Sequence, residues 1–139
     1  MKYRAYAKVN LGLDVASKRE DGYHELKSVM VPIQLHDLIE IHVSEQMHFE
    51  CVPNFLIHPD KNTLLKMIEV CRAKFNFTEN FYIRLYKHIP SQAGLGGGSS
   101  DAAAILNYLD KHLKWNISDQ EKIDLAVQVG ADVPFCLFE

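Results

Sequence analysis

The strongest constraint on the fold of this 139-residue chain is a glycine-rich segment that separates a strand pattern from a helix pattern. Within Pro90–Ser100, four of five consecutive positions are glycine, namely Gly94, Gly96, Gly97 and Gly98. Glycines adopt backbone conformations closed to other residues and let a ligand approach the main chain closely. At the start of a helix, free N–H groups and the positive end of the helix dipole favour an anion, and a phosphate suits such a site best.

Spacing excludes two common phosphate-binding loops. The Walker pattern requires lysine after its last glycine, whereas Ser99 follows Gly98. The dinucleotide pattern G-x-G-x-x-G fails as well, because Ser99 stands where its third glycine should be. A turn with a purely structural role is the competing interpretation. Against it, the run Ser99-Ser100-Asp101 adds hydroxyls that can cap the helix or reach a metal ion bound to a phosphate.

Hydrophobic periodicity predicts strands and helices around the loop. Alternating residues predict strands over Lys2–Val9, Leu38–Val43 and Phe81–Lys87. Steps of three and four residues predict one helix over 62–76 with Asn62 as its N-cap, a second after the loop, and a third from a capping box at Ser118 to Gly130. The elements do not alternate strictly as βαβ units, which indicates an α+β fold, and the length favours a single domain over 1–139.

The end of the chain predicts one further element. Val133–Phe138 is a continuous apolar run, and we expect a buried strand there, ending at Glu139 without a closing element. On that expectation the chain is a piece of a longer protein. An uncovered strand would also favour self-association of the chain through its truncated edge.

Composition argues against several classes of protein. The net charge is −3 and there is no Lys/Arg stripe, so we expect neither a nucleic-acid partner nor a membrane surface. No apolar run reaches the length of a membrane-spanning helix. The three cysteines lack CxxC spacing, which argues against a disulfide framework or zinc site and indicates a reducing cytoplasm. We expect Cys71 and Cys136 to be small core residues.

Two charged residues near opposite ends of the chain are candidates for catalysis. Lys8 lies in the first predicted strand and Asp132 lies in the loop Gly130–Pro134. Taken singly, a strand lysine is usually a solvated edge residue and an aspartate after glycine is usually a turn former. Phosphoryl transfer to an alcohol, however, needs a carboxylate that accepts the hydroxyl proton and a cation that steadies developing charge. Beside a phosphate loop, the two residues therefore become a candidate pair.

A third cluster lies at a predicted turn. Asp21-Gly22-Tyr23-His24 presents an aromatic ring and an imidazole, which can stack on and hydrogen-bond a planar ligand such as a nucleobase. A surface hairpin without a ligand is the alternative.

Together these segments resemble the GHMP kinase superfamily. The resemblance rests on Ala7–Leu11, Asp21–His24, Pro90–Ser100 and Gly130–Pro134, which are similar to the opening, substrate-turn, ATP-loop and catalytic-base motifs of that family, and it spans essentially the whole chain. It implies the family's N-terminal domain, a two-layer fold like domain 2 of ribosomal protein S5, in which a mixed sheet packs on helices. It also implies that ATP, Mg²⁺ and a small alcohol are the ligands.

The resemblance assigns roles residue by residue. Asp132 would take the proton from the substrate hydroxyl, with Lys8 beside it, and Asn10, Tyr23 and His24 would contact the substrate. The nucleotide would be bound near its adenine by Asn62 and Lys87 and along its phosphates by the loop residues Pro90, Gly94, Leu95, Gly96, Gly97, Gly98, Ser99 and Ser100. The Ser100 hydroxyl would reach the metal.

The sequence also departs from the family pattern. Tyr6 stands where proline is usual, and Ser91 and Gln92 replace more common loop residues. Family members are roughly twice as long, with a second domain that completes the substrate site, so we expect this chain alone to be inactive or nearly so. Two rival interpretations remain, a member of the family acting on a different small alcohol and a non-catalytic binding module with the same architecture. The second interpretation would make it a coincidence that Lys8, Asp132 and the glycine-rich loop occur in one chain.

Overall fold

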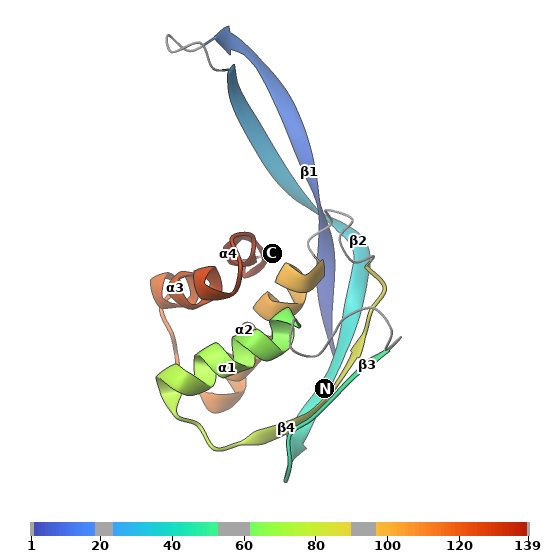
Figure 1. Cartoon of the computed structure of the whole chain (residues 1–139), viewed down its shortest axis with the longest axis vertical. Coiled ribbons are helices and arrows are strands. Elements are labelled where there is room, and N and C mark those ends of the chain that lie inside the picture. Colours follow the sequence, from blue (N-terminus) through green and yellow to red (C-terminus); the bar gives the residue numbers. More distant parts are fainter. Residues whose placement is uncertain (1, 19–23, 53–61, 90–96, 139) are drawn as a thin grey trace.

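The computed structural model has a four-stranded sheet with helices on one of its faces (Figure 1). It describes residues 2–18, 24–52, 62–89 and 97–138, and for 10–18, 24–30 and 97 the description covers the backbone. The elements follow one another as β1 (Lys2–Lys18), β2 (His24–Ser44), β3 (His48–Val52), α1 (Thr63–Phe75), β4 (Asn80–Tyr86), α2 (Gly97–Leu113), α3 (Asp119–Val129) and α4 (Val133–Cys136). The two-layer α+β architecture predicted from the sequence is confirmed.

The sheet is mixed. Its order is β1-β2-β4-β3, with β1–β2 and β2–β4 antiparallel and β3–β4 parallel. β1 and β2 are much longer than the strands expected from the sequence, and β3 was not predicted at all. Pairing from Lys2↔Glu40 to Lys18↔His24 makes a hairpin whose far half projects beyond the helical layer (Figure 1).

An irregularity in this hairpin places one functional candidate on the inner side of the sheet. The register of β1 and β2 shifts between Tyr6 and Lys8, where Lys8 pairs with Pro32. Proline has no N–H to give to a ladder, so it is tolerated at such irregular positions. Ala7 and Lys8 are consecutive residues and both are buried, at 0% and 3% exposure, which a regular alternating strand would not allow. A bulge of this kind re-aims a side chain, and here it turns Lys8 inward.

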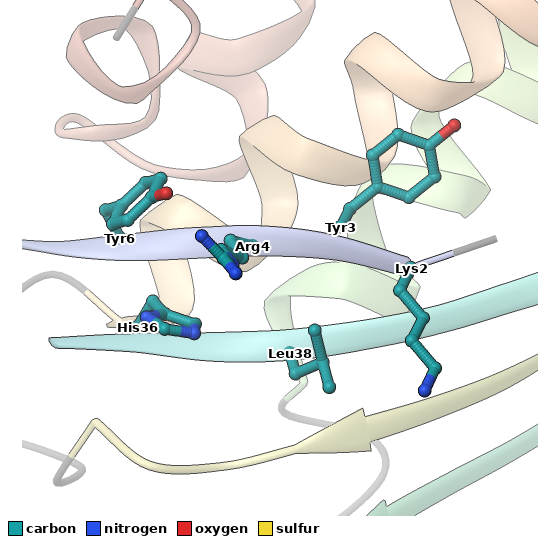
Figure 2. A pocket seen from close by; sticks show the side chains of 6 residues that line it. All are labelled: Lys2, Tyr3, Arg4, Tyr6, His36 and Leu38. Atoms are coloured by element: carbon teal, nitrogen blue, oxygen red, sulfur yellow. The ribbon is translucent and has the colours of Figure 1, made fainter. Parts of the chain in front are cut away.

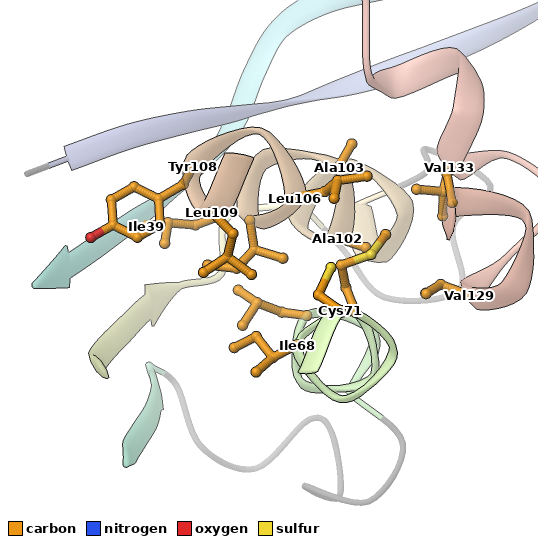
Figure 3. Packing of buried hydrophobic residues seen from close by; sticks show 14 of the residues in the cluster. Ile39, Ile68, Cys71, Ala102, Ala103, Leu106, Tyr108, Leu109, Val129 and Val133 are labelled. Carbon is orange, nitrogen blue, oxygen red and sulfur yellow. The ribbon is translucent and has the colours of Figure 1, made fainter. Parts of the chain in front are cut away.

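The core lies between the sheet and the helices. Alternate residues of β4, Phe81, Ile83 and Leu85, are fully buried, as the period of two predicted. Figure 3 shows Ile39 of β2 beside Tyr108 and Leu109 of α2, and α1 adds Ile68 and Cys71 to the same buried cluster. Each buried side chain of this size stabilises the fold by about 1.5–3 kcal/mol relative to leaving it in water. The same packing fixes the helix ends that carry the candidate site, and Cys71 and Cys136 are buried in it as predicted.

Two predicted helix starts are confirmed by their caps. The Asn62 side-chain oxygen accepts hydrogen bonds from the N–H groups of Leu64 and Leu65, at 2.9 and 3.3 Å. At α3, the Ser118 hydroxyl accepts from the N–H of Glu121 at 3.2 Å. Both caps satisfy N–H groups that a helix start leaves without partners. Among the described helices the longest is α2 with 17 residues, and none in these ranges is long and apolar enough to cross a bilayer.

The strand predicted over Val133–Phe138 is wrong. Val133–Cys136 forms the short helix α4 instead. Pro134 sits in its first turn, where the missing proline N–H has no partner to lose. The buried residues Val133, Cys136 and Leu137 follow the three- and four-residue steps of a helix, and Phe138 is 53% exposed. A short apolar run does not distinguish the two periods. The expected self-association depended on an uncovered strand in this segment, and because the segment is a helix that argument no longer applies.

Candidate functional site

The N-terminus of α2 is the described part of the glycine-rich loop. Pro90, Gly94, Leu95 and Gly96 lie outside the described residues, whereas α2 begins at Gly97. Ser99 is half-buried and Ser100 is buried. The early N–H groups of a helix have no partners within the helix, and together with the helix dipole they suit an anion. The structure thus places the serines of the loop at a helix start, as the sequence predicted.

The start of α1 packs directly against the start of α2. The Thr63 hydroxyl donates a hydrogen bond to the Gly98 carbonyl at 2.6 Å. A Cβ added at Gly98 would lie 3.1 Å from the Thr63 Oγ1 atom, closer than most real Cβ contacts. Glycine at position 98 therefore permits the close approach of the two helix starts, a packing role in addition to any contact with a ligand.

Lys8 and Asp132 form the ion pair that the sequence could only suggest. The Lys8 Nζ atom lies 3.1 Å from the Asp132 Oδ2 atom, although 123 residues separate the two in the chain. The Lys8 side chain is only 4% exposed, whereas that of Asp132 is 50% exposed. A buried ammonium thus holds a carboxylate whose other side is open to a ligand. This arrangement suits a general base that is oriented from behind.

The backbone places Asp132 in a turn just before α4. Its φ of −91° and ψ of −9° are ordinary for the third residue of a β-turn, which the hydrogen bond from the Val133 N–H to the Gly130 carbonyl closes at 3.3 Å, and its side chain makes no cap hydrogen bond. α2 packs against both β1, which carries Lys8, and α4, which follows Asp132. The elements that carry the end of the glycine-rich loop and the ion pair are therefore in mutual contact.

A second group of charged residues lies deeper, below the start of α2. The Lys87 Nζ atom is 2.6 Å from the Asp37 Oδ2 atom and 3.0 Å from the Asp101 Oδ2 atom, and the three side chains are 2%, 0% and 3% exposed. Burial raises the pKa of Asp101 well above its usual range, and the nearby Asp37 carboxylate raises it further. Burial would lower the pKa of Lys87, but Asp101 and Asp37 outweigh it and the pKa is raised.

Asn62 and Lys87, expected near the adenine, both have structural partners. The Asn62 cap occupies its side-chain oxygen, so a nucleotide contact would use its Nδ2 atom. The Lys87 ammonium is held by Asp37 and Asp101, and its backbone N–H donates to the Val52 carbonyl at 2.8 Å. The side chain of Lys87 therefore faces the protein interior.

The expected substrate residues lie in the hairpin. Asn10 pairs with Met30 in the β1–β2 ladder and His24 pairs with Lys18, whereas Tyr23 lies outside the described residues. Asn10 therefore lies on β1, two positions after Lys8.

Sequence reasoning missed several features. Asp37 received no role, because it directly precedes the strand predicted over Leu38–Val43, and only the structure places it within β2. It also missed a pocket of about 700 Å³ at the N-terminal end of β1 (Figure 2), which is lined by Lys2, Tyr3, Arg4, Tyr6, His36 and Leu38. The rings of Tyr6 and His36 meet there with centroids 5.5 Å apart. The lining residues come from two strands and have no motif spacing.

Fold and site together define an α+β domain with a glycine-rich helix start and a lysine–carboxylate pair. The model of the GHMP kinases N terminal domain matches residues 62–139. A protein of Caldanaerobacter subterraneus subsp. tengcongensis, named 4-diphosphocytidyl-2-C-methyl-D-erythritol kinase, is 46% identical over 137 residues, which are 99% of this chain and 48% of the relative. The chain therefore belongs to the GHMP kinase family, and it spans about half the length of the curated relatives it matches.

Solved structures give the same result. A crystal structure of 4-(cytidine 5'-diphospho)-2C-methyl-D-erythritol kinase aligns with a TM-score of 0.77 at 36% identity and covers 99% of this chain and 48% of that one. A mevalonate kinase structure aligns with a TM-score of 0.69 at 18% identity and covers 97% of this chain and 47% of that one. At that identity the likeness to mevalonate kinase shows the fold alone.

Proposed function

We propose that this chain is the ATP-binding half of a kinase that phosphorylates the 2-hydroxyl of 4-diphosphocytidyl-2-C-methyl-D-erythritol in the non-mevalonate isoprenoid pathway. The observation that carries the proposal is the 46% identity over 99% of the chain to a relative of that name. The Lys8–Asp132 pair supports it, because a protein that only binds its ligand has no need of an oriented carboxylate. The three cysteines without disulfides are consistent with a cytoplasmic enzyme.

The reaction assigns each described group a task. The Asp132 carboxylate accepts the proton of the substrate hydroxyl, whose oxygen then forms a bond to the γ-phosphorus of ATP while the bond between that phosphorus and the bridging oxygen of ADP breaks. Lys8 holds Asp132 in place and offsets negative charge beside it. The N–H groups at the start of α2 bind phosphate oxygens.

Mg²⁺ fits this site as a partner of the nucleotide. Among the described residues, no group of three or more His, Cys, Asp or Glu side chains is placed to hold a metal ion. Mg²⁺ commonly binds through substrate phosphates, waters and one or two protein oxygens, and the Ser100 hydroxyl at the start of α2 is the oxygen we assign. When bound, the ion neutralises charge that develops on the phosphates.

Asn10, Tyr23 and His24 contact the substrate, with Tyr23 flanking the cytosine.

Two measurements test the proposed function. Isothermal titration of this chain with a non-hydrolysable ATP analogue and Mg²⁺ measures nucleotide binding, and a kinase assay of the full-length gene product on the cytidine diphospho-sugar alcohol measures turnover. We expect the full-length protein to be active and this chain alone to be inactive or nearly so. Turnover only with an alcohol that lacks cytidine would identify another acceptor, and nucleotide binding without any turnover would favour a binding role.

Asn62 provides a sharper test of the nucleotide site. Replacing it with alanine removes the α1 cap and lowers the free energy of unfolding by about 1 kcal/mol, whereas Asn62→Asp keeps a cap oxygen and the stability. Both variants lack the Nδ2 donor, so we expect both to weaken nucleotide binding by about threefold to tenfold, the value of one hydrogen bond. Thermal unfolding and isothermal titration measure the two effects.

The matched control for Asn62 is Ser118→Ala. It removes the equivalent cap of α3 and should cost a similar amount of stability without changing nucleotide affinity. If Asn62→Asp binds the ATP analogue as tightly as the unmodified chain, Asn62 is a cap and nothing more.

A further inference from the structure

Asp37 anchors the chain where it enters the phosphate loop. Its Oδ1 atom accepts hydrogen bonds from the backbone N–H groups of His88 and Ile89 at 2.7 and 2.9 Å. These two residues directly precede Pro90, the first residue of the glycine-rich segment. Asp37 lies on β2, an inner strand of the sheet, and its side chain is fully buried. The entry of the loop is therefore tied to an inner strand of the sheet.

Asp101 anchors the chain where it leaves the loop. It follows Ser100 on α2, and its Oδ2 atom accepts a hydrogen bond from the Lys87 ammonium at 3.0 Å. The same ammonium donates to the Asp37 Oδ2 atom at 2.6 Å. Lys87 is thus the bridge through which the start of α2 is connected to β2, the strand that also holds the loop entry.

The direction of the Asp101 carboxyl indicates how this residue acts. Its Oδ1 atom is buried and has no hydrogen-bond partner among the described residues, and the side chain is 3% exposed. A carboxyl that is closed off in this way does not face a nucleotide or its metal ion. Whatever Asp101 contributes to the loop, it contributes by fixing the position of α2.

Stability alone does not account for a cluster of this kind. Burying charged groups carries a desolvation penalty that can exceed their mutual attraction, and apolar residues of similar volume often stabilise a core as well or better. Buried ionic groups do, however, fix geometry in a way that apolar contacts do not. A cluster that ties both ends of one loop to one strand fixes the distance and angle between those ends.

We propose that Asp37, Lys87 and Asp101 are positioning residues of the nucleotide site, which hold both ends of the phosphate loop on β2 so that the N–H groups at the start of α2 point at the phosphates of ATP. The proposal rests on the nucleotide-binding role proposed above. It assigns to Lys87 a task that its buried side chain can perform, in place of a direct side-chain contact with the adenine.

The test uses two substitutions of Asp101 in the full-length gene product and one control. Asp101→Ala removes both oxygens, and Asp101→Asn keeps the shape and an oxygen that Lys87 can donate to. Leu109→Ala removes a fully buried side chain from the same helix, about 12 Å further along its axis. Isothermal titration with the ATP analogue and Mg²⁺, and the KM values for ATP and for the alcohol, are the measurements.

We expect Asp101→Ala to weaken nucleotide binding and raise the KM for ATP by about tenfold or more, because small displacements of a binding group have large effects. The KM for the alcohol should change little, Asp101→Asn should recover most of the affinity, and Leu109→Ala should bind nucleotide normally despite its loss of stability. If Asp101→Ala and Leu109→Ala weakened nucleotide binding equally, the cluster would have a structural role only. Asp101→Asn as weak as Asp101→Ala would mean that an oxygen able to accept the Lys87 hydrogen bond does not restore the position of α2, and would overturn the proposal.

Hydrogen exchange without nucleotide separates this proposal from the proposed function. Amides of residues 101–105 should exchange faster in Asp101→Ala than in Leu109→Ala, because the first hydrogen-bonded turn of α2 loses its tie to β2. If the unmodified protein fails to bind the ATP analogue, the proposed function fails, yet this difference in exchange would still show that the cluster holds the loop. If the exchange is the same in both variants, the positioning role is wrong whatever the nucleotide does.

Discussion

Asp132→Asn in the full-length gene product is expected to lower kcat by about 10²- to 10⁴-fold, the usual contribution of general acid–base catalysis. The amide has the shape of the carboxylate but accepts no proton at neutral pH. Nucleotide affinity should change little, because the phosphates are assigned to the start of α2 and not to Asp132. A fall in kcat with an unchanged Kd for the ATP analogue would support the assignment of the base.

The control for Asp132 is Asp124→Asn, the same chemical change on an exposed residue of α3. Both variants should be assayed well below their unfolding midpoints, because Asp132→Asn also removes the carboxylate that lies 3.1 Å from the buried Lys8 ammonium. If Asp132→Asn turns over as fast as Asp124→Asn, the proton is taken by another group and the pair is structural.

The parts of the fold that local signals determine could be predicted from the sequence. The Asn62 cap of α1 and the alternation of Phe81, Ile83 and Leu85 in β4 were read directly from residue types and spacing, and the structure shows both. These features depend on neighbours within a few positions. The helix α4 was missed because an apolar run of six residues fits a strand or a helix, and only its packing against α2 and α3 decides between them.

The sequence named candidate site residues but could not give their geometry. A lysine at position 8 and an aspartate at 132 have no local signal that brings them together, and their contact depends on the register shift between Tyr6 and Lys8, beyond which Lys8 points inward. The structural role of Lys87 was harder still to predict from the sequence. Its two partners come from β2 and α2, and long-range ion pairs of this kind have no sequence period.

The largest expected effect on stability comes from Lys87→Met. This change leaves the Asp37 and Asp101 carboxyls buried without the ammonium that both contact. Breaking a buried ion pair from one side typically costs 3–5 kcal/mol, about a third or more of the stability of an ordinary domain. The matched control is Lys66→Met on the exposed face of α1, which should cost about 0.5 kcal/mol or less. Urea unfolding of both variants measures the difference.

The pH dependence of this effect has a definite sign. The folded pKa of Lys87 is raised above 10.5, so its stabilisation is complete below pH 10.5 and is lost only as the pH rises through the folded value. The folded pKa of Asp101 is raised above 3.8, so this carboxyl favours the folded state below pH 3.8 and loses that contribution as the pH rises through its folded value. The deficit of Lys87→Met should therefore be largest near neutral pH and shrink in acid, where the Asp101 carboxyl is protonated. Adding Asp101→Asn removes one of the two unpaired carboxyls and should recover part of the deficit at neutral pH. A deficit equal to that of Lys66→Met would mean that the buried cluster contributes nothing to the fold.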